Sequence, residues 1–155
     1  MTAGEISEPE GNARGRRVAI VAARFNDLIV SSLLKGARES WSTRGGGEEL
    51  LVVRVPGAFE LPVVARRLAG SGKYDAVVAL GCVIRGDTPH FDYVAGECAR
   101  GLQLASLETG VPVIFGVLTV ETLDQALERA ALSAGNKGGE SMECALEMAA
   151  VMARL

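Results

Sequence analysis

The chain of 155 residues has few aromatic side chains, a single histidine and only three cysteines. Phe, Trp and Tyr together make up 5% of it, so the core must consist mainly of Val, Leu, Ile and Ala. The cysteines show no CxxC spacing, and one histidine cannot form a histidine cluster. These counts exclude the usual metal-ligand sets. They favour buried free thiols in a reducing compartment for Cys82, Cys98 and Cys144.

The sequence also lacks a strong charge of either sign and any apolar run of membrane-spanning length. With a formal net charge of −3 and scattered basic residues, nucleic acid is a poor candidate for the main partner. The first fifteen residues are polar and mostly acidic, unlike a secretory signal. We therefore expect residues 1–15 to form a mobile tail, and the protein to be cytoplasmic with no membrane partner.

Apolar residues make up 48% of the chain and charged residues 23%, which excludes a disordered protein. The length suits one domain with one core, and we expect that domain to span residues 16–155. The composition is slightly apolar for a small monomer, which indicates that part of the surface is buried against another subunit.

Four runs rich in β-branched residues predict β-strands, at residues 17–23, 50–55, 74–84 and 111–119. Each run is nearly continuously apolar, which is typical of strands covered on both faces. Helical spacing is found at residues 28–41, 59–68, 90–107, 122–131 and 140–154. The alternation predicts right-handed crossovers. We expect an α/β fold, a three-layer α/β/α sandwich with a four-stranded parallel sheet.

Several polar residues near the expected helix starts have local interpretations. Asn26 or Asp27 could cap the first helix, whose apolar stripe would start at Leu28. Thr119 and Glu121 resemble a cap and a first-turn acid for the fourth helix. Asp92 would be an ordinary helix-start carboxylate, and Asp87 would turn toward solvent or toward Arg85.

In open parallel sheets, ligands bind outside the carboxyl ends of the strands. Phe25 and Asn26 follow the first strand, and Phe25 is either a packing plug or a flat surface for a planar heterocycle. The segment VPGAFELP follows the second strand and offers Phe59 as a further apolar surface. Its Glu60 either complements a helix dipole or accepts hydrogen bonds from substrate hydroxyls.

The segment GCVIRGDTPHFDYV, residues 81–94, follows the third strand and is the richest in chemistry. Main-chain amides from Gly86 to Thr88 would form an anion pocket at the start of the next helix. His90 would lie beside that pocket, and an imidazole can exchange protons near neutral pH. A lone histidine is more often structural than catalytic, but this position favours a catalytic role.

Three further residues, Phe115, Arg129 and Lys137, lie within or after the fourth strand. Arg129 would be about 10 Å below the start of its helix, pointing away from its own chain's site. These residues are either ordinary surface groups or face a neighbouring subunit's pocket. A site shared between subunits would account for them and for the apolar excess together.

Five segments occur in one order: Phe25-Asn26, VPGAFELP, GCVIRGDTPHFDYV, FGVLTVETLDQALERA (115–130) and AGNKG (134–138). Together they resemble the lumazine synthase family, from about Arg16 to the C-terminus. The resemblance implies a flavodoxin-like fold and pentamers with sites between adjacent subunits. It implies condensation of 5-amino-6-(D-ribitylamino)uracil with 3,4-dihydroxy-2-butanone 4-phosphate to 6,7-dimethyl-8-ribityllumazine, phosphate and water, the penultimate step of riboflavin biosynthesis. No metal or organic cofactor is implied.

The resemblance also implies roles for single residues. At the pyrimidine, Phe25 would stack and Asn26 would supply backbone contacts, with the ring site lined by Val83 and Ile84. The ribityl chain and neighbouring ring atoms would be held by Ala58, Phe59 and Glu60. The phosphate would be bound by Gly86, Asp87 and Thr88, and His90 would shuttle protons. The adjacent subunit would supply Phe115 over the substrate, Arg129 to the phosphate and Lys137 near the pyrimidine.

The chain departs from the family pattern in two places, and two rival functions stay open. Asp87 stands where many relatives carry a smaller or uncharged residue. The segment 129–137 is short and lacks the insertion associated with family members that stop at pentamers, which favours an icosahedral shell of pentamers. A flavodoxin-like flavin carrier would need a Ser/Thr-rich loop after the first strand, which Arg24-Phe25-Asn26 is not. A non-catalytic shell or scaffold paralogue would have no need for His90, Arg129 and Lys137 together.

Overall fold

The computed structural model describes residues 4–133 and 135–155. Four strands form one sheet: β1 (Val18–Ala23), β2 (Leu51–Val55), β3 (Ala76–Ile84) and β4 (Val113–Val120). Their order across the sheet is β2-β1-β3-β4, and every neighbouring pair is parallel. The sheet therefore has β2 and β4 at its edges and all carboxyl ends on one side.

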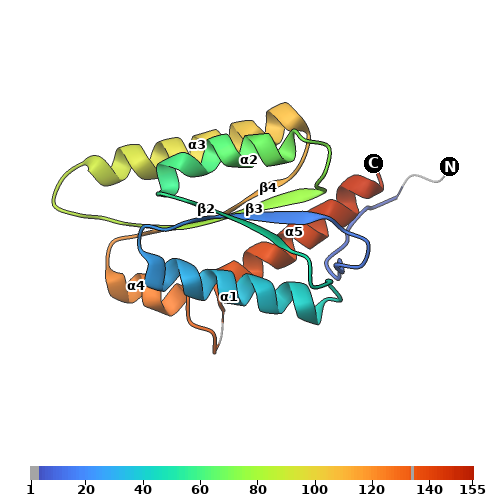
Figure 1. Cartoon of the computed structure of the whole chain (residues 1–155), viewed down its shortest axis with the longest axis horizontal. Helices are drawn as coiled ribbons and strands as arrows, with labels where there is room; N and C mark the ends of the chain where they lie inside the picture. Colours follow the sequence, from blue (N-terminus) through green and yellow to red (C-terminus); the bar gives the residue numbers. More distant parts are fainter. Residues whose placement is uncertain (1–3, 134) are drawn as a thin grey trace.

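Helices cover both faces of this sheet (Figure 1). One face lies under α2 (Leu61–Ala69) and α3 (His90–Thr109). The other lies under α1 (Asp27–Thr43), α4 (Leu123–Arg129) and α5 (Lys137–Ala153). A short 3₁₀ turn, η1 (Ala58–Glu60), leads into α2. The predicted three-layer α/β/α sandwich with a flavodoxin-like, four-stranded parallel sheet is confirmed.

The continuous apolar runs of the two central strands suit positions where both faces of the sheet exclude water. β1 is buried along its whole length, and β3 is buried from Ala76 to Cys82. One core cluster includes Ile20, Leu33 and Met142, and the other includes Val21, Leu61 and Leu102. The edge strands differ, because β2 is exposed at Leu51 and β4 at Phe115 and Thr119, so the cover predicted for all four runs is found along the central strands only.

The α1 and α5 helices pack closely, because glycines stand where a side chain would not fit. A Cβ atom on Gly138 would collide with the main chain of Leu33, and one on Gly36 would collide with Asn136. Both glycines are buried. The two helices therefore approach backbone to backbone.

Asn136 fixes the start of α5 through hydrogen bonds of both the oxygen and the nitrogen of its side-chain amide. Its Oδ1 accepts a hydrogen bond from the Gly139 amide at 3.0 Å, as an N-cap does. Its Nδ2 donates to the carbonyls of Ser32, at 3.1 Å, and Ala130, at 2.9 Å. The expected start at Glu140 is wrong, since this cap begins the helix at Lys137.

Two other local predictions are also wrong. Leu28 is 75% exposed, so the apolar stripe of α1 starts at Ile29. Thr119 does not cap α4, because it lies within β4, opposite Val83 of β3. The cap is Thr122, whose hydroxyl accepts a hydrogen bond from the Gln125 amide at 3.2 Å.

The second half of the segment expected as a mobile tail lies against the domain. Gly11 and Ala13 are buried, and the Ala13 amide donates to the Arg44 carbonyl at 2.9 Å. Glu8 forms an ion pair with Arg154 at 2.8 Å, near the C-terminus. Residues 1–3 lie outside the described part of the chain.

The three thiols differ in exposure. Cys82 and Cys98 are buried as expected, and burial raises the pKa of each to about 11. Cys144 is exposed, so the expectation of three buried thiols is wrong for this residue. Among the helices described here, none has the length and apolarity needed to cross a membrane.

The close α1–α5 approach predicts that Gly138→Ala destabilises the protein by roughly 1–3 kcal/mol, the usual range for overpacking. The added methyl group would meet the main chain of Leu33, which cannot rotate away. Guanidinium unfolding at one fixed protein concentration measures the change.

Gly96→Ala is the matched control, because Gly96 lies in α3 with nothing within 4 Å of its Cβ position. Alanine there should stabilise the helix by about 0.5–1 kcal/mol. Equal midpoints for the two variants would contradict the close approach.

Candidate functional site

The loops after β1, β2 and β3 are joined by hydrogen bonds at the carboxyl edge of the sheet. The Arg24 amide donates to the Val55 carbonyl at 2.7 Å, and the Phe25 amide donates to the Pro56 carbonyl at 3.0 Å. The Asn26 side-chain Nδ2 donates to the Cys82 carbonyl at 2.8 Å. These bonds bring the first three predicted site segments onto one surface.

Asn26 turns the chain sharply from β1 into α1. Its φ of 62° and ψ of 45° place it in the left-handed region, which asparagine tolerates better than most residues. Asn26 stands at the N-cap position of α1, as one of the two expected alternatives had it, but its side chain makes no capping bond and its amide donates to β3 instead. Phe25 is left 71% exposed, which excludes a packing plug within the single chain.

The turn after β2 presents a second exposed ring beside a carboxylate. Ala58 is buried in η1, whereas Phe59 is 58% exposed. Glu60 is half-buried before α2 and makes no side-chain cap bond. A Cβ on Gly57 would lie 3.3 Å from Glu60 Oε1, so this carboxylate extends back over the turn. The geometry leaves it free to accept hydrogen bonds from a ligand.

The segment after β3 is the most open part of this edge. Val83 and Ile84 are half-buried at the end of the strand, and residues 85–90 are all exposed. The Thr88 hydroxyl accepts a hydrogen bond from the His90 amide at 3.4 Å, just before the first turn of α3. Gly86, Asp87, Thr88 and His90 therefore share one accessible surface.

Arg85 joins this segment to its neighbours, a role that the sequence did not suggest. Its Nε lies 2.8 Å from Glu121 Oε2, and its Nη2 lies 3.3 Å from Asp92 Oδ1. The hydrogen bond with Asp92 raises the pKa of the guanidinium. Arg85 thus pairs with Asp92 and Glu121 and not with Asp87, so that expected pairing is wrong. Asp87 is exposed to solvent, which was the other expected alternative.

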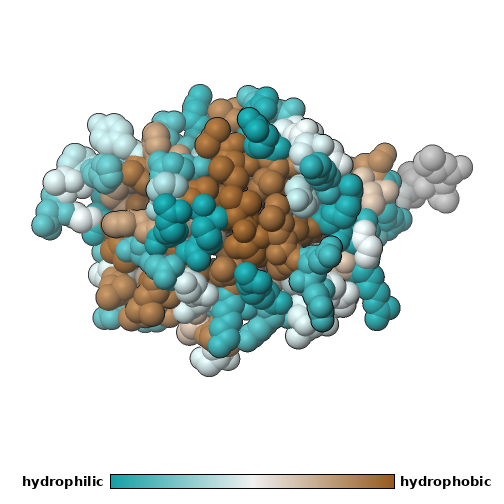
Figure 2. Space-filling view, viewed as in Figure 1, coloured by the Kyte–Doolittle hydropathy of each residue, from teal (hydrophilic) through white to brown (hydrophobic). Residues whose placement is uncertain are grey.

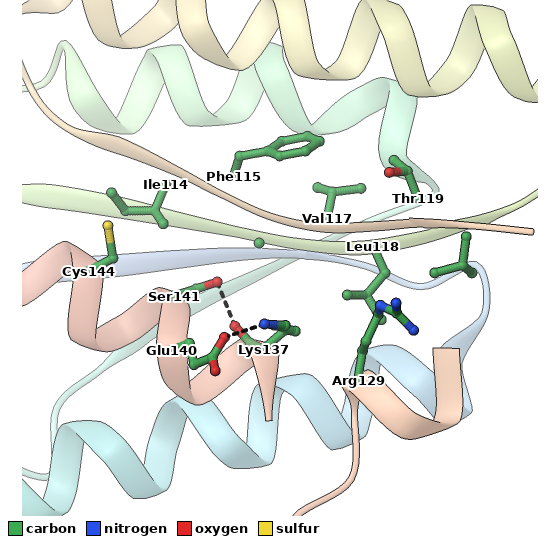
Figure 3. A pocket seen from close by; sticks show the side chains of 12 residues that line it. Ile114, Phe115, Val117, Leu118, Thr119, Arg129, Lys137, Glu140, Ser141 and Cys144 are labelled. Atoms are coloured by element: carbon green, nitrogen blue, oxygen red, sulfur yellow. Dashed lines mark hydrogen bonds and ion pairs between the residues drawn. The ribbon is translucent and has the colours of Figure 1, made fainter. Parts of the chain in front are cut away.

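The remaining predicted residues line a different concave surface, of about 390 Å³, along the edge strand β4 (Figure 3). Phe115 points to one side of β4, while Arg129 and Lys137 approach from the α4 and α5 side (Figure 3). Arg129 Nη1 donates to the Gln125 carbonyl at 3.0 Å. Lys137 forms an ion pair with Glu140 at 2.8 Å.

Of the α5 residues that line this surface, sequence reasoning named Lys137 and missed Glu140, Ser141 and Cys144. With Lys137 they occupy positions i, i+3, i+4 and i+7, which form one face of a helix. The misplaced start of α5 hid this spacing. The Ser141 hydroxyl donates to the Lys137 carbonyl at 2.7 Å, which ties the face together (Figure 3).

The two groups of predicted residues do not meet within the described chain. The surface along β4 is lined by Phe115, Arg129 and Lys137 and by none of the residues after β1, β2 and β3. The ion pair of Arg129 is with Glu128 of its own helix, at 3.9 Å. A single subunit therefore presents the predicted site residues on two surfaces, which we call its two partial sites.

The described residues contain no cluster of three His, Cys, Asp or Glu side chains placed to hold a metal ion. The model of the 6,7-dimethyl-8-ribityllumazine synthase family matches residues 15–153, nearly the whole described domain. The match spans both partial sites. The chain therefore belongs to the 6,7-dimethyl-8-ribityllumazine synthase family, which acts in riboflavin biosynthesis.

Proposed function

We propose that the protein condenses 5-amino-6-(D-ribitylamino)uracil with 3,4-dihydroxy-2-butanone 4-phosphate. The products are 6,7-dimethyl-8-ribityllumazine, phosphate and water. The observation that carries the proposal is one edge of the sheet with an exposed aromatic ring, an uncommitted carboxylate and the only histidine. These groups suit a planar base, a polyol and proton transfer, and family membership supports the same reaction.

The ribitylaminouracil would bind across the loops after β1, β2 and β3. The exposed ring of Phe25 offers a face for stacking on the pyrimidine. Asn26 would contribute main-chain contacts, and its left-handed conformation, braced on β3, holds that main chain in place. Glu60 would accept hydrogen bonds from the ribityl hydroxyls. The remaining contacts of the ring and the ribityl chain would come from Ala58, Phe59, Val83 and Ile84.

The phosphorylated substrate would bind at the start of α3. Main-chain amides of Gly86 and Asp87 and the hydroxyl of Thr88 are all on the exposed segment before that helix, where anions bind well. His90 would move protons during imine formation, phosphate elimination and ring closure. Orienting the two reactants would supply much of the acceleration, since proximity can contribute roughly 7–11 kcal/mol.

Phe115, Arg129 and Lys137 would come from an adjacent subunit. Arg129 would stabilise the charge that develops on the departing phosphate. A ring of identical subunits needs two different surfaces that complement each other. Apolar side chains gather around β2 and α2, where Leu51 and Val63 are exposed (Figure 2), and the opposite edge strand β4 carries the other partial site. We propose pentameric rings, assembled into an icosahedral shell.

Mixing the two substrates with the protein tests the proposed function directly. Lumazine fluorescence should rise faster than in the uncatalysed mixture. A rate equal to the uncatalysed one would favour a non-catalytic shell protein. Stoichiometric, tightly held FMN in the purified protein would favour a flavin carrier.

His90→Ala should slow turnover by about 10²–10⁴-fold without abolishing it, because one general acid–base contributes about that much. Binding and orientation by the other residues would remain. Steady-state kinetics measure the change, with assembly size as the control for folding. An unchanged turnover number would remove His90 from the mechanism.

Subunit mixing tests the shared site. The His90→Ala and Arg129→Ala variants should each be impaired alone. Co-assembly after unfolding and refolding together should restore roughly a quarter of wild-type activity, since about that share of interfaces pairs an intact His90 with an intact Arg129.

If both residues acted within one chain, every subunit in the mixture would lack one of them. Mixing would then restore nothing. Wild-type protein taken through the same refolding supplies the reference activity.

A further inference from the structure

We propose that Arg85 is a positioning residue that holds the segment 86–89, and with it His90, in one geometry. The inference rests on the proposed function, because that segment is the proposed phosphate site. Arg85 follows the last residue of β3, and its amide donates to the Val120 carbonyl of β4 at 2.9 Å. The main chain is thus anchored immediately before it enters the open segment.

The guanidinium connects this anchor to both neighbouring elements. Its Nε contacts Glu121 at 2.8 Å, just after β4, and its Nη2 contacts Asp92 at 3.3 Å, in the first turn of α3. The guanidinium carbon also lies 4.4 Å from the centre of the Phe91 ring. The ion pair between Arg85 and Asp92 therefore closes a loop that contains His90 and the proposed phosphate-binding segment 86–88.

The charges around Arg85 argue against a direct role in phosphate binding. Two carboxylates share the one guanidinium, so the positive charge is already neutralised. A phosphate dianion placed there would also meet Asp92 and Glu121. Arg85 would therefore shape the site, and the proposed counter-charge for phosphate is Arg129 of the neighbouring subunit.

The planar fork of arginine is needed for this role. It reaches two carboxylates with separate nitrogens while one face lies on an aromatic ring. A lysine in its place would keep the charge but present a single nitrogen. This difference separates positioning from simple electrostatic attraction.

The test compares Arg85→Lys, Arg85→Gln and Glu121→Gln with wild type in steady-state kinetics. Each variant should lower kcat/KM for the phosphorylated substrate by about 10- to 100-fold, through a higher KM, a lower kcat or both, as expected when a reacting group is misplaced. The KM for the ribitylaminouracil should change less, by no more than about twofold, because the Arg85 side chain pairs with Asp92 and Glu121 and with none of Phe25, Asn26 and Glu60.

Arg17→Gln is the matched control. Arg17 forms an exposed ion pair with Asp75 at 3.1 Å. Asp75 directly precedes β3, so this ion pair lies at the opposite end of the strand from Arg85. Exposed ion pairs contribute little to global stability, so the Arg85 variants and Arg17→Gln should all fold. The Arg85 and Glu121 variants should change the kinetics, whereas Arg17→Gln should not.

Amide hydrogen exchange in the substrate-free protein supplies a readout that does not depend on activity. Exchange at the hydrogen-bonded amides of Arg85, His90 and Asp92, which flank the open segment, should be faster in both Arg85 variants and unchanged in Arg17→Gln. Unchanged exchange and unchanged kinetics would overturn the inference. So would rescue by Arg85→Lys together with tighter substrate binding in Glu121→Gln, which would identify a direct phosphate ligand.

Failure of the proposed function would look different. Wild-type protein that forms no lumazine would refute the reaction, while hydrogen exchange would still decide whether Arg85 holds the segment. If the wild type forms lumazine and the Arg85 variants show unchanged kinetics and unchanged exchange, only the positioning role is refuted.

Discussion

β1 pairs in parallel with β2 on one side and with β3 on the other, and helices cover both faces of the sheet. Parallel pairing requires each connection to cross over the sheet, which places every strand's carboxyl end at the same edge. The loops after β1, β2 and β3 therefore lie at one edge because of the strand pairing, whatever the loop sequences are. Phe25, Glu60 and His90 lie at the same edge of the sheet for this reason.

The same pairing leaves β4 at an edge, and the predicted site residues are divided between two surfaces. Phe115, Arg129 and Lys137 line a surface on that strand, away from the group around His90. Neither surface alone combines a stacking ring, a proton donor and a cation for the phosphate. In the proposed mechanism, assembly is therefore part of catalysis, because it brings the anion-binding guanidinium to the proton-transferring imidazole.

Ion pairing at the carboxyl edge shows how local charges are used. Arg54 is paired with Asp27 at 2.8 Å, and that contact lowers the pKa of the carboxyl. Arg85 is paired with Asp92 and Glu121. These cations connect adjacent elements and are not directed at a ligand. In the proposed function, main-chain amides at this edge and Arg129 of the neighbouring subunit would hold the phosphate.

The amino-acid sequence by itself determined the strands, the layered architecture and the family. Continuous apolar runs report burial on both faces, and short ordered motifs such as VPGAFELP carry their own signal. It also placed Phe25, Glu60 and His90 on one edge, because strand order along the chain is enough to say which loops follow strands.

Only the tertiary structure decided which polar groups find one another. Asn136 caps α5 while holding Ser32, which is 104 residues away, and Asn26 bonds to β3 in place of its own helix. Arg85 reaches Glu121 because β3 and β4 run in register to their last residues. Such partners are chosen by distance in space, and a single hydrogen-bonding side chain carries no periodicity from which that distance could be read.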